Sequence, residues 1–339
     1  MNIWVGFIIL VVILLAFDLG ILNRNPHKVT TREALKWTSL WVSLALAFSG
    51  FIYYAYDTNL WGIGQEVGTP LAGKEAFMLY LTGYLVEQSL SIDNVFVIAV
   101  IFTYFQIPPK FQHRVLFWGI LGAVVFRGVM IAIGAFLIAK YAWIMYVFGA
   151  FLLYSAYKMA TSGDEPVDPD DNPVIRLVKK IFPVTTHMDG EKFFIRRLGV
   201  VAATPLFIAL LVIETTDIMF AVDSIPAIFA ITTDPFIVFT SNIFAILGLR
   251  SLYFVLAAIL EKFQYLKYSL VFILAFVGLK MLALEFVHLP PWVSLAVIAL
   301  ALTTGIFYSL YMDRKYGHHE VHLPEDEAPM VEESDQIKA

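Results

Sequence analysis

The chain has 339 residues, of which 59% are hydrophobic and only 15% charged, and its formal net charge is −5. This composition is too apolar for a soluble protein of such length, and several apolar runs reach the ~20 residues that cross a bilayer, so the sequence predicts a polytopic membrane protein. The chain contains no cysteine, which excludes disulfides, thiolate zinc sites, iron–sulfur clusters and cysteine nucleophiles.

Nine apolar stretches predict an all-α protein with nine transmembrane helices. Within a few residues at each end they cover residues 2–22, 37–56, 75–104, 115–139, 141–160, 199–232, 235–260, 266–287 and 292–312. The first stretch lacks a basic start and a small-residue cleavage site, so we interpret it as a retained helix and not as a signal peptide. Four tryptophans near the starts of stretches are typical of the membrane–water interface: Trp4, Trp37, Trp143 and Trp292.

The basic residues of the connecting segments predict the orientation of the chain. Segments after the first, third, fifth, seventh and ninth stretches carry most of the lysines and arginines, whereas the alternate segments hold only Lys74 and Lys140. Because basic loops stay in the cytoplasm, the N-terminus is predicted outside and the C-terminus inside. In a bacterium, the chain would lie in the inner membrane with a periplasmic N-terminus and a cytoplasmic C-terminus.

Two segments are predicted not to cross the membrane. Residues 161–198 form a cytoplasmic loop that opens with the Pro- and Asp-rich linker GDEPVDPDDNP. The loop continues with VIRLVKKIF, which is compatible with a short amphipathic helix on the membrane surface. The acidic tail 317–339 is predicted to be disordered.

The third and sixth stretches share a pattern of polar residues. Three positions match at a constant offset of 130 residues: Glu87 with Asp217, Asp93 with Asp223, and Asn94 with Ser224. In each copy an intramembrane arginine and a lysine follow at nearly equal spacing: Arg127 and Lys158, then Arg250 and Lys280. Residues 75–160 and 199–288 are therefore predicted to be two copies of one three-helix unit. The two copies enter the membrane from opposite sides, and such inverted repeats are typical of secondary transporters.

The remaining parts of the chain lie outside the repeat. Residues 1–74 provide two N-terminal transmembrane helices, and residues 289–316 provide the ninth.

Six acidic residues lie inside the predicted helices, where each ionisable side chain costs about 2.5–3.5 kcal/mol on insertion scales: Asp18, Glu87, Asp93, Glu214, Asp217 and Asp223. Three intramembrane bases accompany them: Arg127, Arg250 and Lys280. One explanation is structural, with ion pairs that hold the helices together. The excess of acids favours a second explanation, in which a divalent cation or transferable protons complete the charge balance and the three bases hold the empty site together.

Helical geometry predicts which of these acids face one another. At ~100° per residue, Glu214 and Asp217 share one face of the sixth stretch. Asp223 would point about 120° away from Asp217 on an ideal helix, and Asp93 stands in the same relation to Glu87. Pro226 removes one backbone hydrogen bond, so an unwound turn at 222–226 is expected to direct Asp223 inward and to free carbonyl oxygens.

The candidate ligands are all oxygen atoms. Carboxylates, the Asn94 amide, the Ser224 hydroxyl and freed carbonyls suit a hard cation such as Mg²⁺, Ca²⁺ or Mn²⁺. Ligand type alone does not choose among these ions.

Two segments resemble the signature segments of a known family. EQSLSIDNVFV, and ETTDIMFAVDSIPAIFAIT followed by DPFIVFTSNIFAILGLRSLYF, are similar to those of the TerC family of integral membrane proteins, nearest to its Alx branch. The resemblance extends over most of the chain and implies export of manganese from the bacterial cytoplasm. It further implies that the ion is bound by Glu87, Asp93, Asn94, Glu214, Asp217 and Asp223, with Asp18 in a segment that is also similar.

The residue patterns predict a secondary transporter, and the family resemblance implies that it exports Mn²⁺. Proton exchange on the same carboxylates is the expected coupling. Mn²⁺ is then the transported substrate, no cofactor is bound permanently, and the lipid bilayer is the other partner. No phosphate-binding loop or nucleophile–base arrangement indicates an enzyme, and the basic clusters at membrane edges do not indicate nucleic-acid binding. A transporter of Ca²⁺ or an organic cation, and a non-transporting membrane scaffold for stress responses, remain as alternatives.

Overall fold

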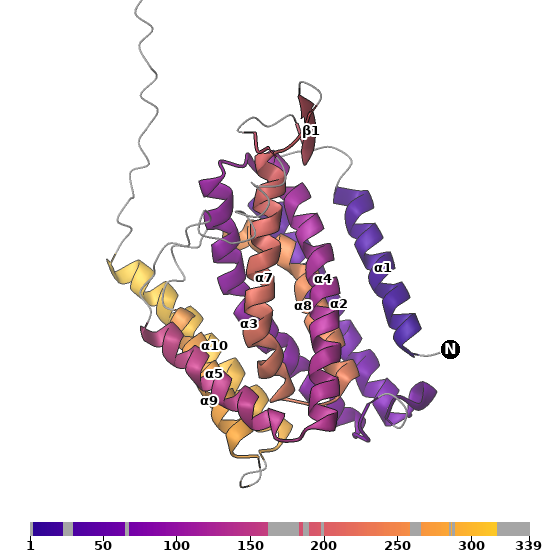
Figure 1. Cartoon of the computed structure of the whole chain (residues 1–339). Helices are drawn as coiled ribbons and strands as arrows, with labels where there is room; N and C mark the ends of the chain where they lie inside the picture. Colours follow the sequence, from indigo (N-terminus) through magenta and orange to yellow (C-terminus); the bar gives the residue numbers. More distant parts are fainter. Residues whose placement is uncertain are drawn as a thin grey trace, which may run out of the picture.

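The computed structural model describes residues 3–22, 30–64, 68–161, 183–185, 190–197, 200–257, 266–284, 286 and 289–316. These residues form nine α-helices, one 3₁₀ turn (η1, Leu60–Gly62) and a two-stranded hairpin (Figure 1). The predicted helical membrane architecture is confirmed in outline.

Each predicted apolar stretch overlaps one of the nine helices of the described residues: α1 Ile3–Leu22, α2 Thr31–Asp57, α3 Gly73–Tyr104, α4 Pro109–Lys140, α5 Ile144–Thr161, α7 Pro205–Phe229, α8 Pro235–Leu256, α9 Leu266–Leu282 and α10 Pro291–Tyr316. Four of them begin with proline, whose fixed φ and missing N–H suit the first helical position. Thr30 caps α2 by accepting a hydrogen bond from the Glu33 backbone N–H at 3.3 Å.

Six of the helices in the described residues are long and apolar enough to cross a membrane, namely α2, α3, α4, α7, α8 and α10. In α1 the apolar segment Ile3–Asp18 is shorter. Large apolar side chains cover the outside of the bundle, including Val12 and Ile13 on α1, Phe136 on α4 and Phe307 on α10. An apolar outer surface of this extent fits a lipid environment and not water.

The sixth stretch begins later than predicted. Its first residues form a hairpin strand, because β1 (Phe194–Arg197) pairs antiparallel with β2 (Val200–Ala203), and α7 starts only at Pro205. The Thr204 hydroxyl donates to the backbone carbonyl of Lys192 at 2.8 Å and so closes the hairpin against the helix start. The predicted surface helix in VIRLVKKIF and the predicted disorder of 317–339 lie outside the described residues.

The helices form an upright bundle and a tilted group beside it (Figure 1). In the upright bundle, α3 packs against α2, α7 and α8, and α4 packs against α7 and α8. The tilted group consists of α5, α9 and α10. The outer helix α1 reaches the bundle through long side chains, since Trp4 and Phe7 form ring contacts with Phe236 of α8.

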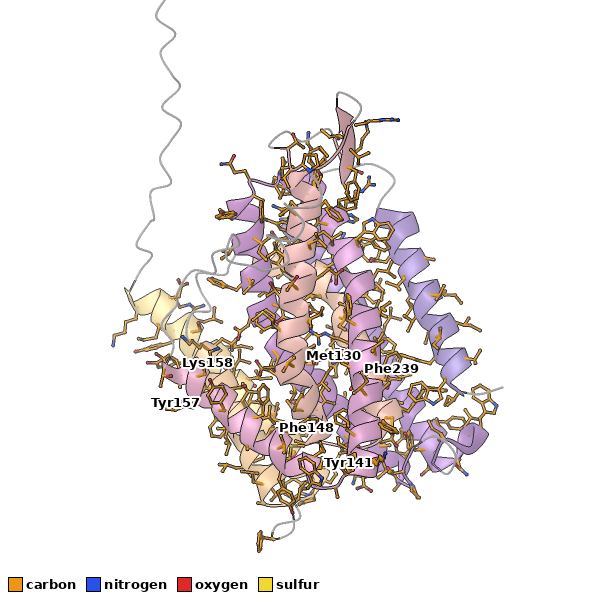
Figure 2. The ribbon with its side chains drawn as sticks, viewed as in Figure 1. Met130, Tyr141, Phe148, Tyr157, Lys158 and Phe239 are labelled. Carbon is orange, nitrogen blue, oxygen red and sulfur yellow. The ribbon has the colours of Figure 1, made fainter. Side chains whose placement is uncertain are left out.

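Glycines allow α5 and α9 to cross closely. A Cβ added at Gly278 would lie 3.0 Å from the carbonyl oxygen of Gly149, and one added at Gly149 would lie 3.0 Å from Leu282. The start of α5 thus contacts the end of α9, and the two helices are antiparallel. Figure 2 follows α5 from Tyr141, at the turn after α4, to Lys158 near its other end.

Asp234 joins three parts of the chain at the end of the bundle opposite the hairpin. Its Oδ1 accepts hydrogen bonds from the backbone N–H groups of Phe236 and Ile237, which caps α8. Its Oδ2 accepts from the Tyr56 hydroxyl at 2.7 Å and from the Thr69 backbone N–H at 2.9 Å. The segment between α2 and α3 is therefore fixed to the start of α8.

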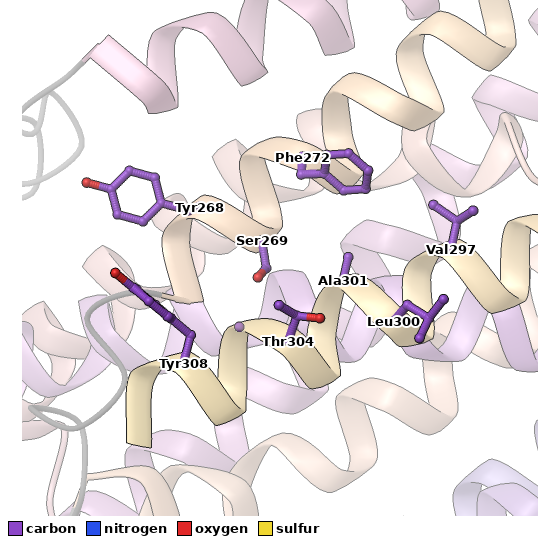
Figure 3. A pocket seen from close by; sticks show the side chains of 9 residues that line it. Tyr268, Ser269, Phe272, Val297, Leu300, Ala301, Thr304 and Tyr308 are labelled. Carbon is purple, nitrogen blue, oxygen red and sulfur yellow. The ribbon is translucent and has the colours of Figure 1, made fainter. Parts of the chain in front are cut away.

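A groove of about 800 Å³ lies between α9 and α10. Figure 3 shows Tyr268 and Tyr308 at one end of this groove and Phe272 and Val297 toward the other. None of the residues that line it is charged. The groove is therefore distinct from the intramembrane acids.

Candidate functional site

The centre of the bundle is occupied by the guanidinium group of Arg127. This residue lies on α4 and is 1% exposed. Its Nη2 donates to Asp217 Oδ1 at 2.8 Å and its Nε to Asp217 Oδ2 at 3.2 Å, which makes a two-point contact with α7. Its Nη1 pairs with the Glu87 carboxylate of α3. One arginine thus holds an acidic residue from each predicted repeat.

Other polar side chains complete the surroundings of this ion pair. Asn242 of α8 donates to Glu87 Oε2 at 2.9 Å, and the Ser224 hydroxyl lies 3.4 Å from Arg127 Nη1. In the amide orientation that satisfies its hydrogen bonds, Asn94 accepts from Arg127 Nη2 at 3.3 Å. A buried charge needs such partners because the hydrocarbon supplies none.

A small cavity adjoins this group, and we call it the acidic cavity. Its volume is about 40 Å³, and its polar lining residues are Glu87, Asp93, Asn94, Arg127, Asp223 and Ser224. The space is sufficient for one or two water-sized particles. The equivalent acidic positions of α3 and α7 therefore face one shared space.

Asp223 is held on its side of the acidic cavity by α5. The Ser155 hydroxyl donates to Asp223 Oδ1 at 2.7 Å, and the ammonium of Lys158 is close enough to attract the same carboxylate. Asp93 is half-buried on the opposite wall, on α3.

The expected unwinding of α7 does not occur. The helix is continuous from Pro205 to Phe229, so residues 222–226 stay helical around Pro226. Asp223 nevertheless lines the acidic cavity, which lies among α3, α4, α5, α7 and α9. No freed carbonyl oxygens are needed to bring this carboxylate to the site.

Asp18 lies apart from the acidic cavity. It is 2% exposed on α1, and its carboxylate pairs with Arg250 of α8. Asp18 and Arg250 therefore neutralise each other away from the acidic cavity.

Glu214 and Lys280 also lie apart from the acidic cavity. Glu214 packs directly against Gly122 of α4, in the space that a Cβ would occupy. It faces α4 as Asp217 does, which confirms that the two acids share one helix face. Lys280 is half-buried on α9 and takes part in none of the ion pairs formed among the described residues.

Comparison with known proteins adds an independent observation. The model of the "Integral membrane protein TerC family" matches residues 72–316, which is well over half of the chain. The chain belongs to the TerC family. An uncharacterized membrane protein of Myxococcus xanthus is 48% identical over 92% of this chain and 93% of its own length. The putative membrane-bound redox modulator Alx of Escherichia coli K12 is 47% identical over 87% and 90%, respectively. No solved structure matches.

The TerC match includes both acidic segments and leaves the first two helices outside. It begins at the start of α3 and ends with α10. Arg127, its partners Glu87 and Asp217, and the acidic cavity therefore all lie within the TerC region. The Asp18–Arg250 pair joins a residue outside that region to one inside it.

Two residues of the site were missed by sequence reasoning. Asn242 carries one of the hydrogen bonds to Glu87, and Ser155 carries one to Asp223. Asn242 stands in the polar triplet Thr-Ser-Asn inside the seventh apolar stretch, a signal that could have identified it. Ser155 is a single small hydroxyl residue in an apolar helix and gives no such signal.

Ion pairs occupy the centre of the site, where Arg127 contacts Glu87 and Asp217. Within the described ranges, no three acidic or histidine side chains come together closely enough to form a metal-binding cluster. The positive charge between Glu87 and Asp217 is supplied by Arg127. The acidic cavity beside it offers oxygen atoms from Asp93 and Asp223, the atom type that hard divalent cations prefer.

Proposed function

We propose that this TerC protein is a secondary transporter that exports Mn²⁺ from the cytoplasm through the acidic cavity. The observation that carries the proposal is that the equivalent residues Asp93 of α3 and Asp223 of α7 line one cavity, together with Glu87 of α3. A substrate site between two repeats near the middle of the membrane is the arrangement that inverted-repeat transporters use.

The pattern of helix packing supports two inverted repeats, α3–α5 and α7–α9. Under this relation the contact of α3 with α8 corresponds to that of α7 with α4, and both are present. Glycine brings the helices close in each: a Cβ at Gly83 would lie 2.9 Å from Ser241 Oγ, and one at Gly119 would lie 3.4 Å from Ile213. The third helices, α5 and α9, pack antiparallel against each other, as expected for elements beside a two-fold axis.

Chemistry of the lining supports a hard divalent cation as cargo. Two carboxylates from equivalent positions of the two predicted repeats, Asp93 of α3 and Asp223 of α7, line the acidic cavity. Asn94 and Ser224 add an amide oxygen and a hydroxyl beside them. We infer that Asp93 and Asp223 receive the ion, and that Arg127 keeps Glu87 and Asp217 neutralised when the ion is absent.

The proposal includes the orientation and location of the chain. All nine helices cross the bacterial inner membrane, with the N-terminus in the periplasm and the hairpin and C-terminus on the cytoplasmic side. The loop 161–198, the basic start of α4 and the basic ends of α5 and α10 then share the cytoplasmic face. Export is driven by a gradient of another ion, for which protons moving on the same carboxylates are the simplest candidate.

The name of the Alx relatives suggests a redox-related role, which fits this proposal only indirectly. The chain has no cysteine, so its own residues cannot take part in thiol–disulfide exchange. A redox effect would have to follow from the transported solute.

Transport of radioactive Mn²⁺ into everted membrane vesicles tests the proposal. We expect native protein to accumulate Mn²⁺ and the Asp93→Asn and Asp223→Asn variants to lose uptake while remaining in the membrane. Asp57→Asn is the matched control, because it makes the same change of charge at an exposed position at the end of α2. Loss of uptake when the pH gradient is collapsed would identify protons as the coupling ion.

Other outcomes of this experiment separate the alternatives. Uptake of Ca²⁺ or an organic cation, with Mn²⁺ failing to compete, would retain the transporter and replace its cargo. Absence of any uptake by folded protein would overturn the proposal and leave the acids with a structural role.

A further inference from the structure

A second cavity lies next to the acidic cavity, toward the helix ends that carry the hairpin, and we call it the inner cavity. Its volume is about 20 Å³, which is room for about one water molecule. Most of its lining is apolar, with Ile101 and Leu116 among the residues nearest the hairpin end. Its charged lining residues are Asp217 and Arg250.

The Arg127–Asp217 ion pair separates the two cavities. Arg127 lines the acidic cavity and Asp217 lines the inner cavity. Asn94 and Phe220 line both. If Asp217 moved away from Arg127, the wall between the two cavities would lose its central contact.

Arg250 has an unused hydrogen-bond donor at the inner cavity. The residue is 3% exposed, and its Nη2 pairs with Asp18. Its Nη1 is buried and has no hydrogen-bond partner in the part of the chain that the structure describes. A buried donor without a partner is costly, and more so when it is charged. Asp217 is the acidic residue on the lining of the same cavity, and its carboxylate could satisfy this donor.

The repeat relation assigns the same partner to Arg250. Arg127 and Arg250 are equivalent positions, as are Glu87 and Asp217. In a transporter with inverted repeats, exchanging the conformations of the two units converts one access state into the other. The contacts that Arg127 makes now with Glu87 and Asp217 would then be made by Arg250.

We propose that Arg250 is a positioning residue that binds Asp217 in the opposite transport state, and that Asp18 holds Arg250 back in the present one. In the opposite state Asp217 leaves Arg127, the two cavities join, and the acidic cavity opens toward the hairpin side. The inference rests on the proposed transport function for its two states, but not on the identity of the ion.

The absence of native cysteine makes the opening directly measurable. A single reporter, Leu90→Cys, is placed on the lining of the acidic cavity. Its rate of modification by a membrane-impermeant thiol reagent is measured from each side, in everted and right-side-out vesicles, without Mn²⁺. The reporter is combined with native sequence, with Asp18→Asn, and with Asp18→Asn plus Arg250→Gln.

We expect Asp18→Asn to raise the rate from the hairpin side by about fivefold or more, the lower end of typical coupling between two states. Adding Arg250→Gln should return the rate to that of the native background, because the second partner of Asp217 is gone. A purely structural Asp18–Arg250 pair would leave single and double variants alike. That result, or no change with Asp18→Asn, would overturn the proposal.

A second variant covers the case in which Asp18→Asn does not accumulate as folded protein. Arg127→Gln combined with Glu87→Gln removes the present partner of Asp217 without leaving Glu87 as an unpaired buried charge, and it should produce the same rise, again abolished by Arg250→Gln. The readout does not involve Mn²⁺. If the labelling rates change as expected but the protein takes up no Mn²⁺, only the identity of the cargo is rejected. If the protein takes up Mn²⁺ but the labelling rates do not change, only this inference is rejected.

Discussion

Single residues of the site show how a membrane protein can keep several charges in its centre. Arg127 forms three charged hydrogen bonds to two carboxylates, in the forked geometry that a guanidinium provides and an ammonium does not. The guanidinium therefore pairs both carboxylates at once. An incoming ion would have to compete with this arginine for Glu87 and Asp217, or bind at Asp93 and Asp223 beside it.

Replacing Arg127 should be strongly destabilising. Arg127→Gln leaves Glu87, which is 0% exposed, without its charged partner, and breaking a buried pair in this way costs about 3–5 kcal/mol. We expect a lower thermal unfolding midpoint of the purified protein in detergent. Adding Glu87→Gln should restore part of the loss, since the unpaired charge is then removed.

Arg114→Gln is the control for this measurement. Arg114 pairs with Glu191 at 3.1 Å near the surface, with its side chain 37% exposed, and such pairs contribute about 0–1 kcal/mol. Equal unfolding midpoints for Arg127→Gln and Arg114→Gln would contradict the central role of Arg127.

Sequence patterns identified the charged residues better than their partners. The offset between Glu87 and Asp217 predicted that both belong to one site, and Arg127 joins them. The family resemblance placed Asp18 and Glu214 with them, and helix spacing placed Glu214 on the same face as Asp217. Neither argument says which neighbouring helix a face meets. Asp18 faces Arg250 and Glu214 faces Gly122, and these contacts depend on packing between segments far apart in the chain.

The predicted helices agree with the structure where the length of an apolar stretch determines the fold. They agree less well where the local sequence also favours another backbone conformation. All nine stretches contain helices, with proline or a capping residue at several starts. The start of α7 was misplaced because residues 200–203 are apolar but also favour a strand, and Phe194–Arg197 lies within reach to pair with them. Pro226 did not unwind α7, since neighbouring helices and the preceding turn can accommodate a proline in a membrane helix.

Close packing of α5 on α9 should be sensitive to a single methyl group. Gly278→Ala would place a Cβ 3.0 Å from the Gly149 carbonyl oxygen and 3.2 Å from Leu152 Cβ. Overpacking of this kind typically costs about 1–3 kcal/mol. We expect a lower unfolding midpoint and slower Mn²⁺ uptake, because α5 carries Ser155 and Met159 at the acidic cavity.

Gly50→Ala provides the matched comparison. A Cβ at Gly50 of α2 would meet nothing within 4 Å, and alanine favours a helix over glycine by about 0.5–1 kcal/mol. This variant should be at least as stable as the native protein. If Gly278→Ala were also as stable as the native protein, the close packing of α5 on α9 would not depend on glycine at position 278.

The two ends of the molecule differ, and the proposed direction of transport depends on which end faces the cytoplasm. The β1–β2 hairpin and the start of α4 lie at one end, and the turn between α4 and α5 lies at the other. The proposed orientation places the first end in the cytoplasm.

Cysteine labelling tests this orientation. Lys110→Cys and Tyr141→Cys introduce exposed thiols near opposite ends of α4, in a chain without others. An impermeant reagent added to cells with a permeabilised outer membrane should label only the cysteine at position 141. Everted vesicles should show the reverse, and the opposite pattern would invert the direction of transport.

Pairing of buried charges across long stretches of sequence has a consequence for how the protein is made. Arg127 precedes Asp217 by 90 residues, and Glu87 precedes Asn242 by 155. At a synthesis rate of about 5–20 residues per second, Arg127 must wait roughly 5 to 18 s for its second carboxylate. During that interval α3, α4 and α5 lie in the membrane while Arg127 is paired with Glu87 alone. The nascent chain is therefore exposed to quality-control proteases and membrane-insertion factors before its second half has been synthesised.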